Sequence, residues 1–185
     1  MGTRNLTLVQ LNNEIKVAQY GQWDGYPSGQ GRTILNFCRD KDYLLKLKEN
    51  LSHVRFFTDD EIDCFNKLLD KKDEIALQKF DRYNHRDIAA GILKEIALSK
   101  DEEIVLVNDF EFGYDSLFCE WACCINFDTN KLEVYEGFNC SSLSQKQRFY
   151  CEKSKRGYFG IAMIKEYDLD NLPIEDVFLN ELGDE

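Results

Sequence analysis

Hydrophobic and polar residues alternate in two pairs of short runs, a pattern typical of β-hairpins. The first pair, NLTLVQL and EIKVAQY, is separated by Asn12-Asn13, two residues that favour a tight turn. The second pair, LFCEWACCINF and LEVYEGF, flanks the turn sequence DTNK. Side chains alternate along a strand, so the second hairpin has two distinct faces. One face is expected to carry Trp121, Cys123, Ile125 and Phe127, and the other Glu120, Ala122 and Cys124.

Between the hairpins, hydrophobic residues recur at three- and four-residue spacing, as they do on one face of a helix. Residues 32–51 follow this pattern and are interrupted near Asp40. The run TDDEIDCFNKLLD opens with Thr58 and Glu61, which form a capping box and predict the start of a helix. A further helix is predicted over RDIAAGILKEIALS, and a short one over LPIEDVFLNEL near the end of the sequence.

Short strands are also predicted at HVRFF, EIVLV and YFGIAMIKEY. The strands and helices do not alternate regularly, as they would around a parallel sheet. We therefore predict an α+β fold with a largely antiparallel sheet and flanking helices. A chain of 185 residues is long enough for one substantial core, and we expect a single domain over residues 1–185.

The sequence carries 34 acidic and 23 basic residues, and two of its stretches contain acidic residues without any Lys or Arg. These acidic zones are residues 101–130 and residues 168–185. Such zones repel phosphate and attract basic surfaces, so we expect a protein partner and no direct nucleic-acid binding. The candidate partner-binding carboxylates are Glu102, Glu103, Asp109, Glu111, Asp115, Glu175, Asp176, Glu181, Asp184 and Glu185. The alternative interpretation is that the two zones serve solubility alone.

Seven cysteines are many for a sequence without the hydrophobic segment of a signal peptide. On a strand, Cys119 and Cys123 would share one face and Cys124 the other, so the three cannot bind one metal. The two histidines, His53 and His85, are distant from them in sequence, and there is no CxxC pair. We expect reduced, mostly buried thiols, and neither a metal nor a cofactor. No hydrophobic run approaches the roughly 18 residues of a membrane span, so we expect a cytoplasmic protein without membrane association.

The stretch QYGQWDGYPSGQG, residues 19–31, contains four glycines, two tyrosines, a tryptophan and the first proline. Its glycine spacing matches neither a P-loop nor a dinucleotide-binding fingerprint, and it contains no lysine. We therefore interpret this stretch as mainly architectural. Gly25 is expected to take a positive φ, and Trp23 and Tyr26 are expected to be largely buried and to cover one end of the core. Asp24 is expected to bond nearby backbone or Arg4.

The segments MGTRNL and AQYGQWDGYPSGQG resemble a widespread family of phage and bacterial proteins, with a weaker likeness at CEWACCINFDTNKLEVYEGF. Members open with a Thr-Arg strand and carry a signature ahead of a helix, matched here by Trp23, Asp24, Gly25, Tyr26 and Pro27. Some similar proteins of gut phages and mobile elements are type II-A anti-CRISPR proteins. The resemblance implies a counter-defence protein in the cytoplasm of a bacterial host cell. Such a protein would bind the type II CRISPR effector nuclease with its guide RNA and reduce target-DNA binding or cleavage.

A small cytosolic hydrolase is the alternative function. Thr3 would serve as an N-terminal nucleophile only after processing that goes beyond the removal of Met1. A Cys–His pair would need His53 or His85 beside one of the seven thiols, and Asp24 is a candidate acid or base. None of these arrangements supplies a nucleophile, a base and an oxyanion donor together, so we expect a binding protein without catalytic residues.

Overall fold

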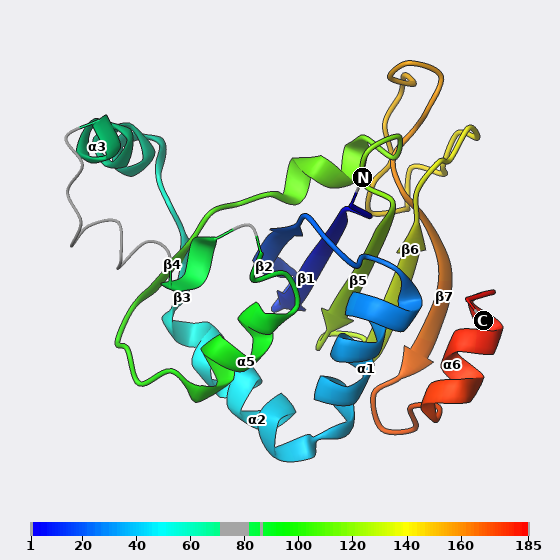
Figure 1. Ribbon diagram of the computed structural model, residues 1–185, viewed down its shortest axis with the longest axis horizontal. Helices are drawn as coiled ribbons and strands as arrows, with labels where there is room; N and C mark the ends of the chain where they lie inside the picture. Colours follow the sequence, from blue (N-terminus) through cyan, green and yellow to red (C-terminus); the bar gives the residue numbers. More distant parts are fainter. Residues whose placement is uncertain (1, 71–81, 86, 185) are drawn as a thin grey trace.

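The computed structural model of the chain describes residues 2–70, 82–85 and 87–184. Within these residues, five strands form one sheet in the order β2-β1-β5-β6-β7, and two more form a small parallel sheet (Figure 1). The strands are β1 (Asn5–Leu11), β2 (Glu14–Gly21), β3 (Val54–Phe56), β4 (Ile104–Leu106), β5 (Trp121–Asn126), β6 (Lys131–Glu136) and β7 (Ala162–Asp168). In the large sheet, β1 and β5 run parallel and the other neighbours run antiparallel. The predicted α+β fold with a largely antiparallel sheet is therefore confirmed.

Most of the described helices pack against one face of the large sheet (Figure 1). The helices are α1 (Arg32–Arg39), α2 (Lys41–Asn50), α3 (Asp59–Asp70), α5 (Gly91–Leu98) and α6 (Glu175–Glu181), with the short turns η1 (Pro27–Gly31), η2 (Leu51–His53) and η3 (Phe110–Tyr114). Buried side chains of α1, α2, α5 and α6 contribute to the core on that face. The opposite face is covered by η3 and by the segment between β6 and β7, whose Phe149 is fully buried. The sheet is thus sandwiched between two hydrophobic clusters.

Both hairpins form where the sequence predicts them, and their turns and faces follow local chemistry. Asn12 and Asn13 take φ values of 57° and 60°, the left-handed conformation that a tight β1–β2 turn requires. On β5, Cys123 contacts the helix-covered core and Cys124 the opposite cluster, as expected from the alternation of side chains. The expectation that Cys119 shares a face with Cys123 is wrong. Cys119 precedes β5 and is not held to its alternation, so it packs in the same cluster as Cys124.

Two of the predicted helix boundaries are made by side chains that cap the backbone. Asp40 separates α1 from α2, because its carboxylate accepts hydrogen bonds from the backbone N–H groups of Asp42 and Tyr43, both at 3.1 Å. At α3, Thr58 N donates to the Glu61 carboxylate at 2.9 Å, and Glu61 N donates to Thr58 Oγ1 at 3.3 Å. The predicted capping box is therefore confirmed.

The helix predicted over RDIAAGILKEIALS is shorter than its hydrophobic pattern indicates, because α5 begins only at Gly91. Ala89 has a φ of 41°, which the right-handed helix does not allow. The preceding turn is closed by the hydrogen bond from Ile88 N to His85 O at 3.0 Å. Hydrophobic periodicity alone does not reveal a single left-handed residue. Arg86, which belongs to the predicted helix, lies outside the described residues.

The Gly-rich stretch packs its backbone against the N-terminal segment, at the start of β1. Gly25 N donates to Thr3 O at 3.0 Å, and the side-chain amide of Asn5 donates to Trp23 O at 3.2 Å. A Cβ on Gly25 would lie 2.8 Å from Thr3 O, so this approach requires glycine. The expectation of a positive φ at Gly25 is wrong, because Asp24 takes that conformation with a φ of 55°. The N-terminal segment and the Gly-rich stretch therefore lie against each other.

We predict that Gly25→Ala lowers the free energy of unfolding by about 1–3 kcal/mol, since the added methyl group forces two backbone segments apart. Urea unfolding followed by circular dichroism measures this change. Gly91→Ala is the matched control, because its Cβ would meet only Ile88 Cγ1, at 3.7 Å. The control should be as stable as the wild type or slightly more stable. A Gly25→Ala protein that is as stable as the wild type would contradict the close contact.

Candidate functional site

Trp23 and Tyr26 of the signature face solvent, so the expectation that they are buried in the core is wrong. Their exposed fractions are 47% and 49%, whereas Gly25 is buried. The Trp23 indole N–H donates to the Asp87 carboxylate at 3.1 Å, and a Cβ on Gly2 would lie 2.1 Å from the indole ring. Both side chains are exposed because the backbone of the loop occupies the inner side, against the N-terminal segment. This leaves the large side chains on the outer side.

The backbone carbonyl oxygen of Asp24 accepts a hydrogen bond from the backbone N–H of Gln30 at 2.8 Å. The expected alternative partner, Arg4, is engaged elsewhere in the described structure. Its guanidinium lies 3.6 Å from the Glu120 carboxylate and 4.7 Å from the centre of the Phe118 ring. The Asp24 residue is exposed. The signature therefore presents one carboxylate and two aromatic side chains on a backbone that is fixed by hydrogen bonds.

The second acidic zone lies beside the signature. The Asp184 carboxylate accepts a hydrogen bond from Ser28 N, in η1, at 2.7 Å. Glu175, the first residue of α6, pairs with Arg32 of α1 at 3.3 Å. These two contacts join the C-terminal segment to the loop that carries the signature. Two of the candidate partner-binding carboxylates thus have a local structural role at the edge of the signature.

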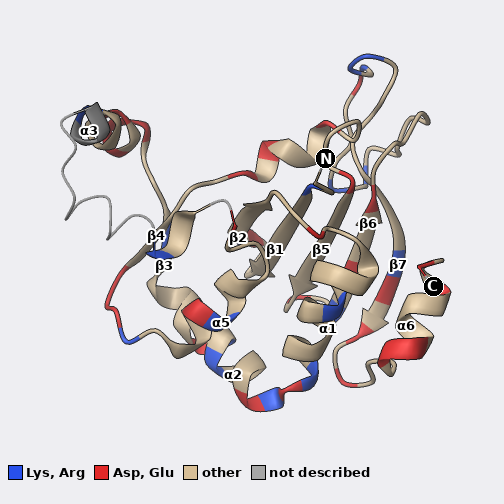
Figure 2. Cartoon of the chain, viewed as in Figure 1, with Lys and Arg blue, Asp and Glu red and all other residues tan. Residues whose placement is uncertain are grey.

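The remaining candidate carboxylates of the second zone that the structure describes are both exposed. Glu181 pairs with Lys165 of β7 at 3.2 Å, and Asp176 lies on α6. Glu185 lies outside the described residues. Figure 2 shows acidic residues along β7 and α6, near the C-terminus. The second zone therefore extends from the signature to the edge of the sheet as an acidic surface, in which Asp168, Glu175 and Glu181 are each paired with a lysine or arginine.

The first acidic zone does not form one surface, because its residues are distributed over separate elements (Figure 2). Glu103 pairs with Arg55 of β3 at 2.8 Å. Asp115, after η3, pairs with Lys155 of the segment between β6 and β7 at 2.8 Å. Glu102 is exposed beside β4. Acidic residues that are close in sequence lie apart here, because the chain leaves β4 and crosses the sheet before it enters β5.

Asp109 has an architectural position at the outer edge of β2. Its carboxylate accepts from Tyr20 N at 3.0 Å, and its own N–H donates to Ala18 O at 3.0 Å. Burial raises the pKa of this carboxyl group, and the hydrogen bond from Tyr20 N opposes the rise. Asp109 thereby satisfies backbone groups of an edge strand, which would otherwise be open to other chains. Glu111 is exposed two residues further along, in η3.

The thiols have the mostly buried environment expected from the sequence. Four of the seven are buried, namely Cys38, Cys119, Cys123 and Cys124. The other three, Cys64, Cys140 and Cys151, are half-buried or exposed. Burial raises the pKa of the four buried thiols, that of Cys123 to about 12. These four are therefore protonated at neutral pH and poor nucleophiles. Among the described residues, no three metal-ligating side chains form a group.

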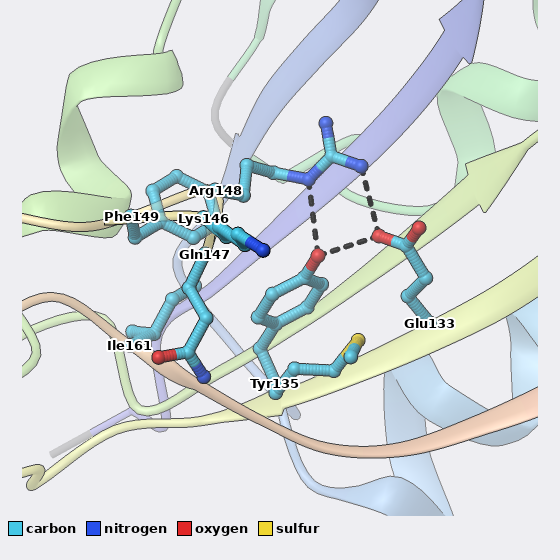
Figure 3. A pocket seen from close by; sticks show the side chains of 8 residues that line it. Glu133, Tyr135, Lys146, Gln147, Arg148, Phe149 and Ile161 are labelled. Atoms are coloured by element: carbon cyan, nitrogen blue, oxygen red, sulfur yellow. Dashed lines mark hydrogen bonds and ion pairs between the residues drawn. The ribbon is translucent and has the colours of Figure 1, made fainter. Parts of the chain in front are cut away.

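A cavity of about 330 Å³ opens on the sheet face away from the helices, between β6, β7 and the segment that joins them. Its lining residues are Glu133, Tyr135, Lys146, Gln147, Arg148, Phe149, Ile161 and Met163. Figure 3 shows Glu133 and Tyr135 on the strand side and Lys146, Gln147 and Arg148 on the loop side. The cavity therefore lies where a long loop is held over the sheet.

The loop is held by an ion pair between the half-buried Arg148 and the buried Glu133, at 2.9 Å (Figure 3). The Tyr135 hydroxyl donates to the same carboxylate oxygen at 2.5 Å and accepts from Arg148 Nε at 3.0 Å. Asn126 donates to the other carboxylate oxygen at 2.7 Å, and Gln10 accepts from Arg148 Nη1. Burial raises the pKa of Tyr135, so its hydroxyl remains a donor at neutral pH. The network joins β1, β5 and β6 to the loop.

The residues of this network are absent from the sites that the sequence predicts. One signal was available, since Glu133 is a charged residue between Leu132 and Val134 in the middle of a predicted strand. A carboxylate at such a position needs a buried partner. The partner, Arg148, lies in a segment without hydrophobic periodicity, so the pattern does not identify it.

Comparisons with known proteins find no relative of this chain. No protein-family model matches the sequence, and no curated protein or solved structure matches it. Among the described residues, no helix is both long enough and apolar enough to cross a membrane.

We predict that Arg148→Ala lowers the free energy of unfolding by about 3 kcal/mol, because it leaves the Glu133 carboxylate buried without its cation. Thermal and urea unfolding measure the effect. Lys153→Ala is the matched control, since Lys153 is exposed in the same segment. It should change the stability by less than about 0.5 kcal/mol. Equal stability of the Arg148→Ala protein and the wild type would show that the ion pair does not hold the loop.

Proposed function

We propose that this protein inhibits the type II CRISPR effector nuclease by binding its guide-RNA-loaded form, which reduces target-DNA binding or cleavage. The family resemblance of the N-terminal segment and the signature suggests the partner. The observation that carries the proposal is the exposure of Trp23 and Tyr26, each about half exposed on a fixed backbone. A signature that served only the core would bury its large aromatic side chains.

Exposed aromatic residues on a rigid loop are suited to binding another protein. Trp and Tyr are enriched among the residues that contribute most to binding energy at protein interfaces. They offer a large apolar surface together with one polar group, here the hydroxyl of Tyr26, whereas the indole N–H of Trp23 already donates to Asp87. Because the hydrogen bonds of Gly25 and Asp24 fix the loop, little conformational entropy is lost on binding.

The acidic surface beside the signature supports a basic partner. The effector nuclease holds its guide and target in a positively charged channel. A surface with exposed Asp24 and Asp176, and with Glu175 and Asp184 at its edge, complements such a channel in charge. Complementary charges mainly raise the association rate, whereas the aromatic residues supply affinity. The first acidic zone is distributed over the fold and contributes less to this proposal.

We predict that the double variant Trp23→Ala/Tyr26→Ala inhibits DNA cleavage at least about tenfold more weakly than the wild type. The assay uses purified nuclease, guide RNA and target DNA, with inhibitor titrated around the nuclease concentration. The fold should remain intact, because half-exposed side chains contribute only about 1–2 kcal/mol each to stability. Leu45→Ala, which removes a 56% exposed side chain from α2, is the matched control and should inhibit normally.

Two charge reversals distinguish the contributions of the two acidic zones to nuclease binding. Asp176→Lys should slow association with the nuclease, and Glu111→Lys should have a smaller effect. Undiminished cleavage with excess wild-type protein would overturn the proposal. Inhibition by an amount far below that of the nuclease would indicate turnover and favour the hydrolase instead. Full inhibition by the double aromatic variant would leave the signature without the binding role proposed for it.

A further inference from the structure

Polar side chains interrupt the hydrophobic core at the start of β1. Asn5 and Thr7 share the helix-covered face of this strand with Val9. On β2, Gln19 lies on the same face of the sheet as Val17. All three polar residues are buried, and Thr7 is fully closed to solvent. Their hydrogen-bonding groups therefore need partners inside the protein.

The three polar side chains lie within one small part of the sheet. Thr7 is directly opposite Gln19 in the antiparallel pair, and Asn5 is opposite Gly21. Directly opposite Cβ atoms are roughly 4.5–5.5 Å apart, so the side chains are within reach of one another. A Cβ on Gly21 would lie 2.6 Å from Asn5 Oδ1 and 2.7 Å from the Cβ of Ala89. The polar side chains are therefore enclosed between the sheet and the turn that precedes α5.

Each of these side chains has one oxygen atom without a hydrogen bond. The Asn5 amide nitrogen donates to two backbone carbonyls, one of them Trp23 O at 3.2 Å. The Gln19 amide nitrogen donates to Tyr20 O at 3.1 Å. Within the described part of the chain, nothing bonds Asn5 Oδ1, Gln19 Oε1 or the Thr7 hydroxyl. Buried polar atoms in folded proteins are almost always paired, either with protein groups or with ordered water.

The three unpaired atoms match the hydrogen-bonding capacity of one water molecule. An amide oxygen can only accept, whereas a hydroxyl can also donate. A water molecule can donate one hydrogen bond to each amide oxygen and accept one from the hydroxyl of Thr7. About three hydrogen bonds are also usual for a buried water. A Ca²⁺ or Mg²⁺ ion takes about six or more oxygen ligands, which three neutral side chains do not supply.

We propose that one water molecule is bound inside the protein between Asn5, Thr7 and Gln19. It donates to Asn5 Oδ1 and Gln19 Oε1 and accepts from Thr7 Oγ1. Because the water holds the oxygen of the Asn5 amide, the amide nitrogen is directed to the carbonyl of Trp23. The water thus fixes the group that anchors the loop carrying the signature. The site is closed to solvent and its tests need no nuclease, so their result is independent of the proposed function.

A crystal structure of the full-length protein, at a resolution that shows ordered water, tests the site directly. We expect one water within about 2.7–3.2 Å of Asn5 Oδ1, Thr7 Oγ1 and Gln19 Oε1. A direct hydrogen bond from the Thr7 hydroxyl to Gln19 Oε1, with no water between them, would overturn the proposal. A metal ion at this position, recognised by a larger set of ligands, would also overturn it.

The substitution Thr7→Val has opposite effects on thermal stability with and without the water. With the water bound, the variant loses an internal hydrogen bond, so its melting temperature should fall by about 2–6 °C. Without the water, the wild-type hydroxyl is unpaired, and its removal should raise the melting temperature. The matched control is Thr129→Val, in the exposed β5–β6 turn, which should shift the melting temperature by less than about 2 °C. A Thr7→Val protein at least as stable as the wild type is incompatible with the proposed water.

Discussion

The close backbone contact between Gly25 and Thr3 is the constraint on which the signature depends. It fixes the loop that follows β2 against the strand that opens the chain. The same N-terminal segment also receives β5, because Arg4 O accepts from Glu120 N at 3.1 Å. One stretch of a few residues therefore aligns the two central parallel strands and holds the signature at their start. Because the backbone of the loop faces the N-terminal segment, the side chains of Trp23 and Tyr26 are exposed to solvent.

The two faces of the sheet are stabilised in different ways. Helices with regular apolar stripes cover one face, and their burial requires no specific polar contact. The other face is covered largely by a long loop, whose position depends on Phe149 and on the ion pair between Arg148 and Glu133. A buried pair contributes little net stability, but its loss is costly, so it specifies one loop position rather than many. The cavity lies between this loop and the strands β6 and β7.

The parts of this fold that sequence predicts are those encoded by adjacent residues. The Asn12-Asn13 turn, the helix break at Asp40 and the capping box of α3 each depend on a few neighbouring side chains and are all present. The exposure of Trp23 depends on a contact between segments that are distant in sequence, so composition suggested burial instead. The Arg148 network has the same origin, since nothing near Arg148 in sequence indicates its partner. The first acidic zone shows the opposite case, because its residues are close in sequence but lie apart in the structure.

The central claim is that the signature and the adjoining acidic helix form the surface that binds the nuclease. Hydrogen–deuterium exchange, measured by mass spectrometry on the free protein and on its complex with guide-loaded nuclease, tests it most directly. The account predicts that amides of residues 23–31 and 175–184 exchange more slowly in the complex, while those of residues 101–115 are unchanged. Protection of residues 101–115 without protection of residues 23–31 would contradict it.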